Sequence, residues 1–253
     1  MDLRNLLSIS MDGPNVNWKF LEMMQDQQKD QFSKQLLVVG SCGLHTMHNA
    51  FKACFSAWSL EKVLSSMYRL FKDAPARRED YMTVNGLTTG ADSNFPFKFC
   101  GHRWLENEPV LTRALEVWDR VIKYVEAVVA KKVSHPNNTS FDVLLNARKD
   151  KLIKAKFQFF LAVSMAVTPF LTKYQSDQPL LPFLVIDLKK LLKGLLRRFI
   201  KKEQLAIHDS AEKLVKIKVL DKDIHLHHSH VDVGFAADAT LKVLSRNDTI
   251  SSR

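Results

Sequence analysis

The chain has 253 residues, of which 46% are hydrophobic and 25% charged, and this composition is typical of a globular protein and excludes a disordered or fibrous one. Its 37 Lys and Arg residues outnumber its 27 Asp and Glu residues, and the resulting net charge of +10 suits a polyanionic partner without indicating a fold. Three cysteines exclude a disulfide framework and favour a reduced compartment, either cytoplasm or nucleus.

No targeting segment is recognisable near the N-terminus, because the apolar stretch over residues 5–10 is too short and too polar for a secretory signal. The most apolar stretch of the chain, residues 157–171, is shorter than a membrane span. It also contains Gln158 and, near its end, Pro169. We therefore expect a buried helix there and no transmembrane segment.

The first third of the chain alternates predicted strands and helices. Residues 1–11 predict a strand, and the apolar periodicity of residues 14–30 predicts a helix. Residues 35–40 are continuously apolar, as expected for a strand buried on both faces of a sheet. Residues 44–72 predict a helix with more apolar residues than one stripe needs, so we expect this helix inside the fold.

The remainder of the chain is predicted to be mostly helical. After turn-forming residues over 84–94, apolar residues recur at helical spacing over 107–132, 141–174 and 179–205. Long helices with short connections fit a helical bundle. Residues 214–220 alternate between polar and apolar side chains, which predicts a short strand.

Three short motifs, taken in order, point to a known family. They are Asp12-Gly13-Pro14 after the first predicted strand, Cys42-Gly43-Leu44-His45 after the second, and Arg103-Trp104 before the first long helix of the bundle. Their order and spacing resemble the hAT (hobo/Activator-type) transposase family over about residues 5–205. The resemblance implies an α/β plus α fold, with a partial ribonuclease-H-like core over 1–75, a mostly helical insertion domain over 76–205, and a short strand, loop and flexible tail over 206–253.

The resemblance places one metal-binding carboxylate in this chain. Asp12 matches the second acidic residue of the family, whose members use three carboxylates to hold two divalent ions. The first would precede Met1, and no glutamate after the insertion stands in a recognisable motif. We therefore expect a transposase-derived remnant that binds nucleic acid or protein, has no transposition activity and no cofactor, and is nuclear rather than cytoplasmic.

Two alternatives to this interpretation stay open. One is an active metal-dependent transposase or nuclease that uses Mg²⁺ or Mn²⁺ and whose first Asp and final Glu lie outside this chain. The other is a helical interaction module whose basic helix engages an acidic protein or a membrane surface. Oligomeric state is not indicated by any of these patterns.

Cys42 and His45 match the Cys-x-x-His element of the family, and Arg103 and Trp104 match its Arg-Trp element, so the resemblance gives all four a structural role. Cys42 and His45 also have zinc-ligand spacing, and Cys100 and His102 would complete a tetrahedral site. We favour packing over zinc, because the Cys-x-His spacing of the second pair is unusual for a zinc site.

The clearest electrostatic feature is the predicted helix over 179–205. Seven cations alternate there with leucines, without an intervening acid: Lys189, Lys190, Lys193, Arg197, Arg198, Lys201 and Lys202. Such an amphipathic basic helix can contact nucleic-acid phosphates, a membrane surface or calmodulin. A bundle helix with a solvated basic face has the same pattern, so the partner stays open.

Four histidines lie close together at His225, His227, His228 and His230. Imidazole nitrogens bind transition metals, so the group is a candidate metal site. A polar surface loop has the same composition, and we prefer that interpretation.

The single matching carboxylate predicts that the protein does not cleave DNA with divalent metal, because one carboxylate binds such an ion weakly. Incubation of the purified chain with supercoiled plasmid and Mg²⁺ or Mn²⁺ should leave the plasmid intact. The matched control is Asp12→Ala. Nicking by the wild type that disappears in this variant would contradict the prediction.

Overall fold

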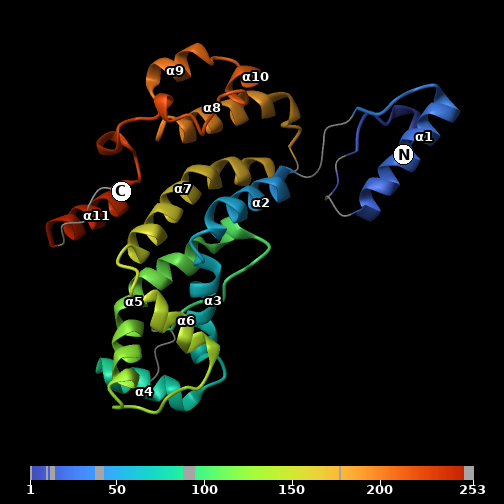
Figure 1. Cartoon of the computed structure of the whole chain (residues 1–253). Coiled ribbons are helices and arrows are strands. Elements are labelled where there is room, and N and C mark those ends of the chain that lie inside the picture. The colour runs from blue at the N-terminus through green and yellow to red at the C-terminus, as the bar shows by residue number, and fades with distance from the viewer. Residues whose placement is uncertain are drawn as a thin grey trace. The chain divides into compact units, whose positions relative to one another are not determined.

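The computed structural model describes residues 2–9, 11, 15–37, 43–87, 95–176 and 178–247. The chain divides into two compact units (Figure 1). The first comprises residues 1–57 and 101–104, and the second comprises residues 58–100 and 105–253. Each unit is built from helices.

The first unit contains α1 (Asn15–Phe32), α2 (Gly43–Ser56) and the 3-10 turn η1 (Leu3–Asn5). The long helices of the second unit are α3 (Leu60–Phe71), α4 (Pro75–Asn85), α5 (Glu108–Val129), α6 (Thr139–Ala147) and α7 (Ile153–Tyr174). Its C-terminal part contains α8 (Leu184–Leu196), α9 (Lys202–Ile207), α10 (Ala211–Leu214) and α11 (Phe235–Asn247). Short 3-10 turns are η3 (Trp104–Asn107), η4 (Leu181–Phe183), η5 (Lys222–Ile224) and η6 (His228–His230).

The predicted α/β class is wrong, and with it the partial ribonuclease-H-like core, because the described residues form no sheet and the fold is all-α. The two predicted N-terminal strands meet only at an isolated parallel bridge between Ser8 and Leu37. The end of the second predicted strand, residues 38–40, lies outside the described residues. A single bridge gives too few ladder hydrogen bonds to make a strand pair.

A glutamine side chain takes the place of a strand partner in this unit. The amide of Gln25 on α1 accepts a hydrogen bond from the Leu36 N–H (3.0 Å) and donates one to the Leu36 C=O (3.1 Å). Gln28, one turn later and 0% exposed, donates to the Leu3 C=O at 2.8 Å. Buried backbone groups need partners, and here α1 supplies them to both apolar segments.

The predicted C-terminal strand over 214–220 is also wrong. Ser210 instead caps a short helix, since its Oγ accepts from the Lys213 N–H at 3.2 Å. Leu214 and Ile217, three residues apart, are both buried in one hydrophobic cluster. The helix ends at Leu214, and residues 215–220 are turns and irregular backbone, so Leu214 and Ile217 reach the cluster without a strand.

Three predicted helices are divided by turns. The helix expected over 179–205 is interrupted over residues 197–201, between α8 and α9. The helix expected over 44–72 is interrupted between α2 and α3, where Ser59 has a left-handed φ of 55°. The helix expected over 141–174 is interrupted between α6 and α7, where the Asp150 carboxylate accepts from the Leu152 N–H at 2.9 Å. A residue in the left-handed region ends a regular helix, so the first break follows from the backbone of Ser59.

The core of the second unit surrounds α5, which packs against α3, α4, α6 and α7 (Figure 1). Four aromatic rings fill the space between α3, α4 and α5: Phe71, Tyr81, Phe95 and Tyr124, with centroids 4.9–6.3 Å apart. Burial raises the pKa of Tyr124 to about 12, with a smaller contribution from Asp80. The phenol therefore stays neutral, as a buried ring requires.

A second, smaller core organises the C-terminal part of this unit. Ile200, Leu205, Leu214 and Ile217 are buried together. Leucines of α8 and neighbouring residues pack against them, half-buried: Leu192, Leu196, Phe199 and Ile224. We call these eight residues the C-terminal cluster. It ties α8, α9 and α10 into one substructure.

The helix α7 connects the two cores. Its Lys173 pairs with Asp187 of α8 at 2.5 Å, and its Gln158 accepts from the Thr240 hydroxyl of α11 at 2.7 Å. By length and composition alone α7 also qualifies as a candidate membrane span, with 33% of its most apolar window buried. Core helices of soluble proteins meet the same criteria, and α7 packs against α5, α8 and α11.

The close approach of α11 to α7 makes Gly234 a test of this packing. Gly234 has a φ of +86°, and an added Cβ would lie 2.6 Å from the Cβ of Ala162 on α7. We expect Gly234→Ala to lower the free energy of unfolding by about 1–3 kcal/mol, through backbone strain and overpacking. Urea denaturation followed by circular dichroism measures the change.

The matched control is Gly194→Ala, because no atom lies within 4 Å of the added Cβ on α8. This variant should be neutral or stabilising by up to about 1 kcal/mol, since alanine is the better helix former. Equal denaturation midpoints for the two variants would show that α11 does not dock closely on α7.

Candidate nucleic-acid interface

Two of the predicted site residues, Asp12 and Cys42, lie outside the described residues. The remaining zinc candidates are His45 and His102, both exposed, and Cys100, which is half-buried. The backbone of Cys100 is held by the Asn107 side chain, which accepts from its N–H at 2.7 Å and donates to its C=O at 3.0 Å. Among the residues that the structure describes, no group of three His, Cys, Asp or Glu side chains could hold a metal ion.

The Arg-Trp element has one buried and one exposed member. Trp104 is only 1% exposed, and its indole N–H donates to the Gly101 C=O at 3.1 Å. A buried indole needs a partner for its N–H, and this bond provides it. Arg103 is exposed. The geometry of Trp104 is that of a packing residue.

The basic helix is α8 together with the residues that follow it. At about 100° per residue, the side chains of Lys189, Lys190, Lys193 and Arg197 fall within an arc of about 100°. The leucines fall outside this arc. Leu191 and Leu195 lie opposite it, whereas Leu192 and Leu196, which belong to the C-terminal cluster, lie beside its Lys189 edge. The cluster therefore packs beside the cationic arc, and Lys190 and Arg197, on the far edge of the arc, are exposed.

Exposure and pairing divide the seven predicted cations into two groups. Arg198 has a side chain that is 13% exposed, and it pairs with Asp232 at 3.1 Å. Lys201 donates to the Asp223 C=O at 2.6 Å.

The other five make no ion pair with any described residue: Lys189, Lys190, Lys193, Arg197 and Lys202. Lys190, Arg197 and Lys202 are exposed, while Lys189 and Lys193 are half-buried. We call these five residues the unpaired cations.

Two acids that interact with lysines of α8, Asp187 and Asp209, are paired with other residues. Hydrogen bonds from Lys173 and then Tyr174 lower the pKa of Asp187, and Lys190 contributes a smaller electrostatic effect. A hydrogen bond from Lys213 is the main cause that lowers the pKa of Asp209. Both carboxylates therefore stay ionised, but each has a lysine of its own, so they neutralise little of the α8 charge.

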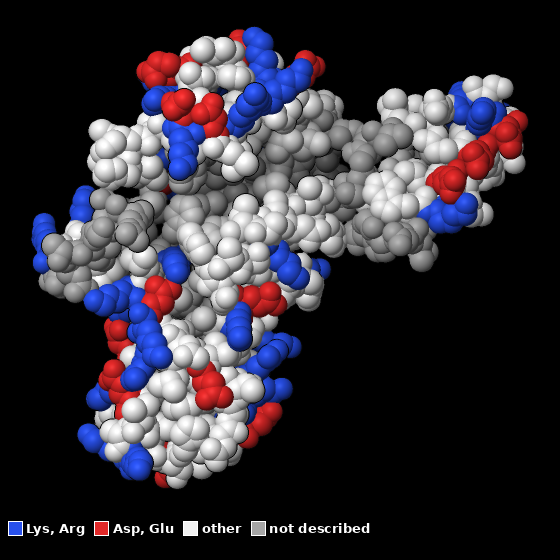
Figure 2. All heavy atoms as spheres, viewed as in Figure 1, with Lys and Arg blue, Asp and Glu red and all other residues white. Residues whose placement is uncertain are grey.

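Further cations follow α10, and two of them lie in the segment 214–220 that the sequence analysis assigned to a strand. Lys216, Lys218 and Lys222 follow α10 and make no ion pair within the described residues. Residues 189–222 contain eleven Lys and Arg residues and four Asp and Glu residues. Figure 2 shows cations of this region together with some acids on the face over α8 to α10. The excess of Lys and Arg over Asp and Glu across residues 189–222 could have identified these lysines as part of the basic surface from the sequence alone.

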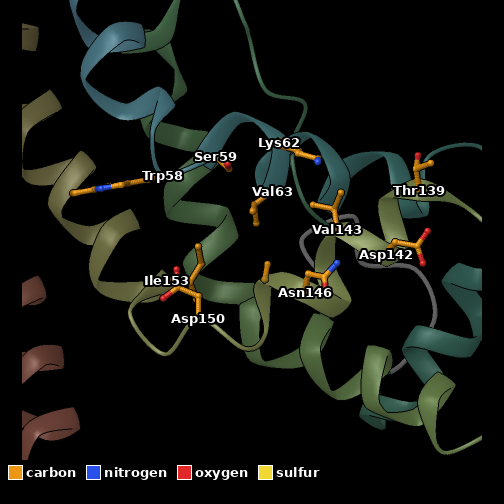
Figure 3. Close-up of a pocket in the computed structure, with 11 residues that line it drawn as sticks. Trp58, Ser59, Lys62, Val63, Thr139, Asp142, Val143, Asn146, Asp150 and Ile153 are labelled. Atoms are coloured by element: carbon orange, nitrogen blue, oxygen red, sulfur yellow. The ribbon is translucent and has the colours of Figure 1, made fainter. Parts of the chain in front are cut away.

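A separate groove lies between α3 and α6, and the sequence analysis did not predict it. Its volume is about 520 Å³, and Figure 3 shows Lys62 and Val63 of α3 across from Asn146 of α6. The lining also includes Asp142 and Asp150, so charges of both signs meet there. Asp150 is already paired with Lys156 at 2.6 Å. A polyanion is therefore better matched by α8 than by this groove.

Comparison with protein-family models, with curated proteins and with solved structures gives no match. The resemblance to hAT transposases therefore stays a prediction from the sequence motifs.

The burial of Trp104 predicts a large loss of stability on truncation. We expect Trp104→Ala to lower the free energy of unfolding by ~3–5 kcal/mol, because an unfilled cavity adds to the lost burial. The control is Trp18→Ala, since Trp18 is 43% exposed and its loss should cost clearly less than the loss of Trp104, which is 1% exposed. Urea midpoints that coincide for the two variants would show that Trp104 is not part of a core.

Proposed function

We propose that this chain is a transposase-derived nucleic-acid-binding protein, without transposition activity, that contacts duplex DNA through the unpaired cations of α8 and its C-terminal extension. The observation that carries the proposal is the arrangement of these cations. Lys189, Lys190, Lys193 and Arg197 lie on one arc of α8 and its C-cap, beside the C-terminal cluster. No ion pair with a described residue neutralises any of the five.

The dimensions of the cationic arc suit a DNA backbone. From Lys189 to Arg197 the helix rises about 12 Å, at 1.5 Å per residue. Duplex DNA carries about seven phosphate charges along that length of its axis. Lys190, Lys193 and Arg197 can therefore each find a phosphate without deforming the helix.

The chemistry of the arc favours phosphate contacts over base contacts. Bases are read by bidentate arginine or by amide side chains such as Asn and Gln, placed in the major groove. The arc carries mainly lysine, which acts as a flexible point charge, and it has no Asn or Gln between Lys189 and Lys202. Binding should therefore be independent of sequence and strongly dependent on salt.

A second candidate function is binding to an acidic amphipathic segment of another protein. It is favoured by Val185 and Leu188, which continue the apolar arc of α8 beyond the C-terminal cluster and are 62% and 43% exposed. Lys189 and Lys190 adjoin them. Such a face matches a helix with apolar residues at i and i+3 and acids on its flanks.

The salt dependence of DNA affinity tests the proposal. For the wild type, the logarithm of the association constant should fall linearly with the logarithm of salt concentration, by about 0.9 for each phosphate neutralised. Reversal of Lys190, Lys193 and Arg197 to Glu should reduce this slope by about three units and leave folding intact, because the apolar arc is unchanged. Fluorescence anisotropy with a labelled duplex at several salt concentrations measures both slopes.

The control reverses three exposed lysines elsewhere in the same unit: Lys98, Lys123 and Lys132. This variant has the same net charge as the first, so it corrects for the long-range effect of charge. A slope close to that of the wild type is expected for the control. Equal losses in both variants would show that α8 is not the contact surface and would favour the protein-binding candidate.

A further inference from the structure

The histidine-rich loop is attached to the end of the basic helix. The Leu226 N–H donates to the Phe199 C=O at 2.7 Å, and the Asp232 N–H donates to the Arg198 C=O at 3.0 Å. Ile200 and His225 form an antiparallel bridge beside these bonds. Residues 227–231 therefore form a loop closed at both ends on the residues that follow Arg197. In Figure 1 the segment that leads to α11 runs beside the α8–α10 substructure.

Three of the four histidines are exposed in this loop and lie close together. The ring centroids of His227 and His228 are 3.9 Å apart, and those of His227 and His230 are 6.3 Å apart. The fourth, His225, is half-buried, and its Nε2 lies 2.7 Å from the Val219 carbonyl oxygen, so it is held in place. We call His227, His228 and His230 the loop histidines.

The hydroxyl of Ser229 lies between two of these rings. Its Oγ is 2.7 Å from Nδ1 of His227 and 3.2 Å from Nδ1 of His230. A serine oxygen can accept two hydrogen bonds. When both imidazoles are protonated, both Nδ1–H groups can donate to Oγ, in place of the 3.4 Å bond from the Ser229 N–H to His227. Both Nε2–H groups and the hydroxyl proton are then free to donate outward.

The charged groups on the segments that hold the loop are mostly cationic. Three imidazolium groups within a few ångströms repel one another. Arg197, Lys201 and Lys222 belong to the segments on either side of the bonds that anchor the loop, and Asp223 follows Lys222 in the chain. At the C-terminal end of the loop, the Asp232 carboxylate is paired with Arg198, so its negative charge is already matched by a cation. A bound polyanion would remove this penalty, because it places negative charge against every one of these groups.

We propose that the loop histidines form part of the same phosphate-binding surface as the unpaired cations, and that DNA binding takes up protons on them. This inference rests on the proposed function. An imidazole has an ordinary pKa of about 6.5, and its charged form is the one that a phosphate prefers. DNA affinity therefore rises as the pH falls through this range, and it falls as the histidines lose their protons above it.

The experiment measures duplex affinity by anisotropy at pH 5.5 and pH 8.0, at several salt concentrations, with the full chain. For the wild type we expect affinity at pH 5.5 to exceed that at pH 8.0 by about tenfold or more, and the log–log salt slope to steepen by two to three units, about 0.9 for each added contact. Replacement of the loop histidines by His227→Asn, His228→Gln and His230→Asn should abolish both changes. Asparagine keeps an acceptor near the position of Nδ1, so the bonds to Ser229 are preserved.

A second variant carries a permanent charge at each position: His227→Lys, His228→Lys and His230→Lys. It should bind at pH 8.0 about as tightly as the wild type does at pH 5.5, with little dependence on pH. His102→Gln, an exposed histidine of the other unit, is the control and should behave as the wild type. Circular dichroism at both pH values confirms that each variant is folded.

The outcomes separate this inference from the function on which it rests. Two outcomes overturn the role of the loop histidines and leave α8 as the contact surface. One is salt-dependent DNA binding that is equally tight at both pH values. The other is a pH response that persists in the neutral variant. Absence of DNA binding at either pH and at low salt overturns both. A pH response in the wild type that is lost in the neutral variant and made constant in the lysine variant supports both.

Discussion

The burial of Ile200, Leu205, Leu214 and Ile217 is the interaction on which the proposed surface depends. A single amphipathic helix of thirteen residues is marginal in water, and packing of its apolar face supplies most of its stability. The C-terminal cluster provides this packing for the second half of α8. The same burial sets the orientation of α8, so hydrophobic burial and the display of cations are two results of one constraint.

Charge concentrated in this way has a cost that the structure only partly relieves. Like charges on one helix face repel one another. A pair of opposite charges that is exposed to solvent contributes little to the free energy of folding. The side chain of Arg198 is 13% exposed and is paired with the Asp232 carboxylate, because an unpaired buried charge is expensive. Lys190 and Arg197 remain in water, where repulsion is screened. A polyanionic ligand would relieve what remains, which is the physical basis for the proposed function.

Side-chain amides explain why the N-terminal segments are not a sheet. Gln25 pairs with both backbone groups of Leu36, and Asn107 does the same for Cys100. In each case one side chain supplies the donor and the acceptor that a neighbouring strand would otherwise provide. An apolar run predicts that a segment is buried, but it does not reveal whether backbone or side chain satisfies its polar groups. The apolar pattern around Leu36 was therefore compatible with a strand and with the observed extended segment.

The amino-acid sequence alone determined the helical character of most of the chain and the amphipathic pattern of α8, because both follow from spacings of three and four residues. It did not determine where helices break, as at Ser59, or how cations are paired. Arg198 and Asp232 are 34 residues apart, so no local pattern links them. Only the tertiary structure, through backbone bonds such as that from Leu226 to Phe199, brought the histidine-rich loop to the end of the basic helix. Contacts between distant segments depend on the shape of the whole cluster, and periodicity carries no information about it.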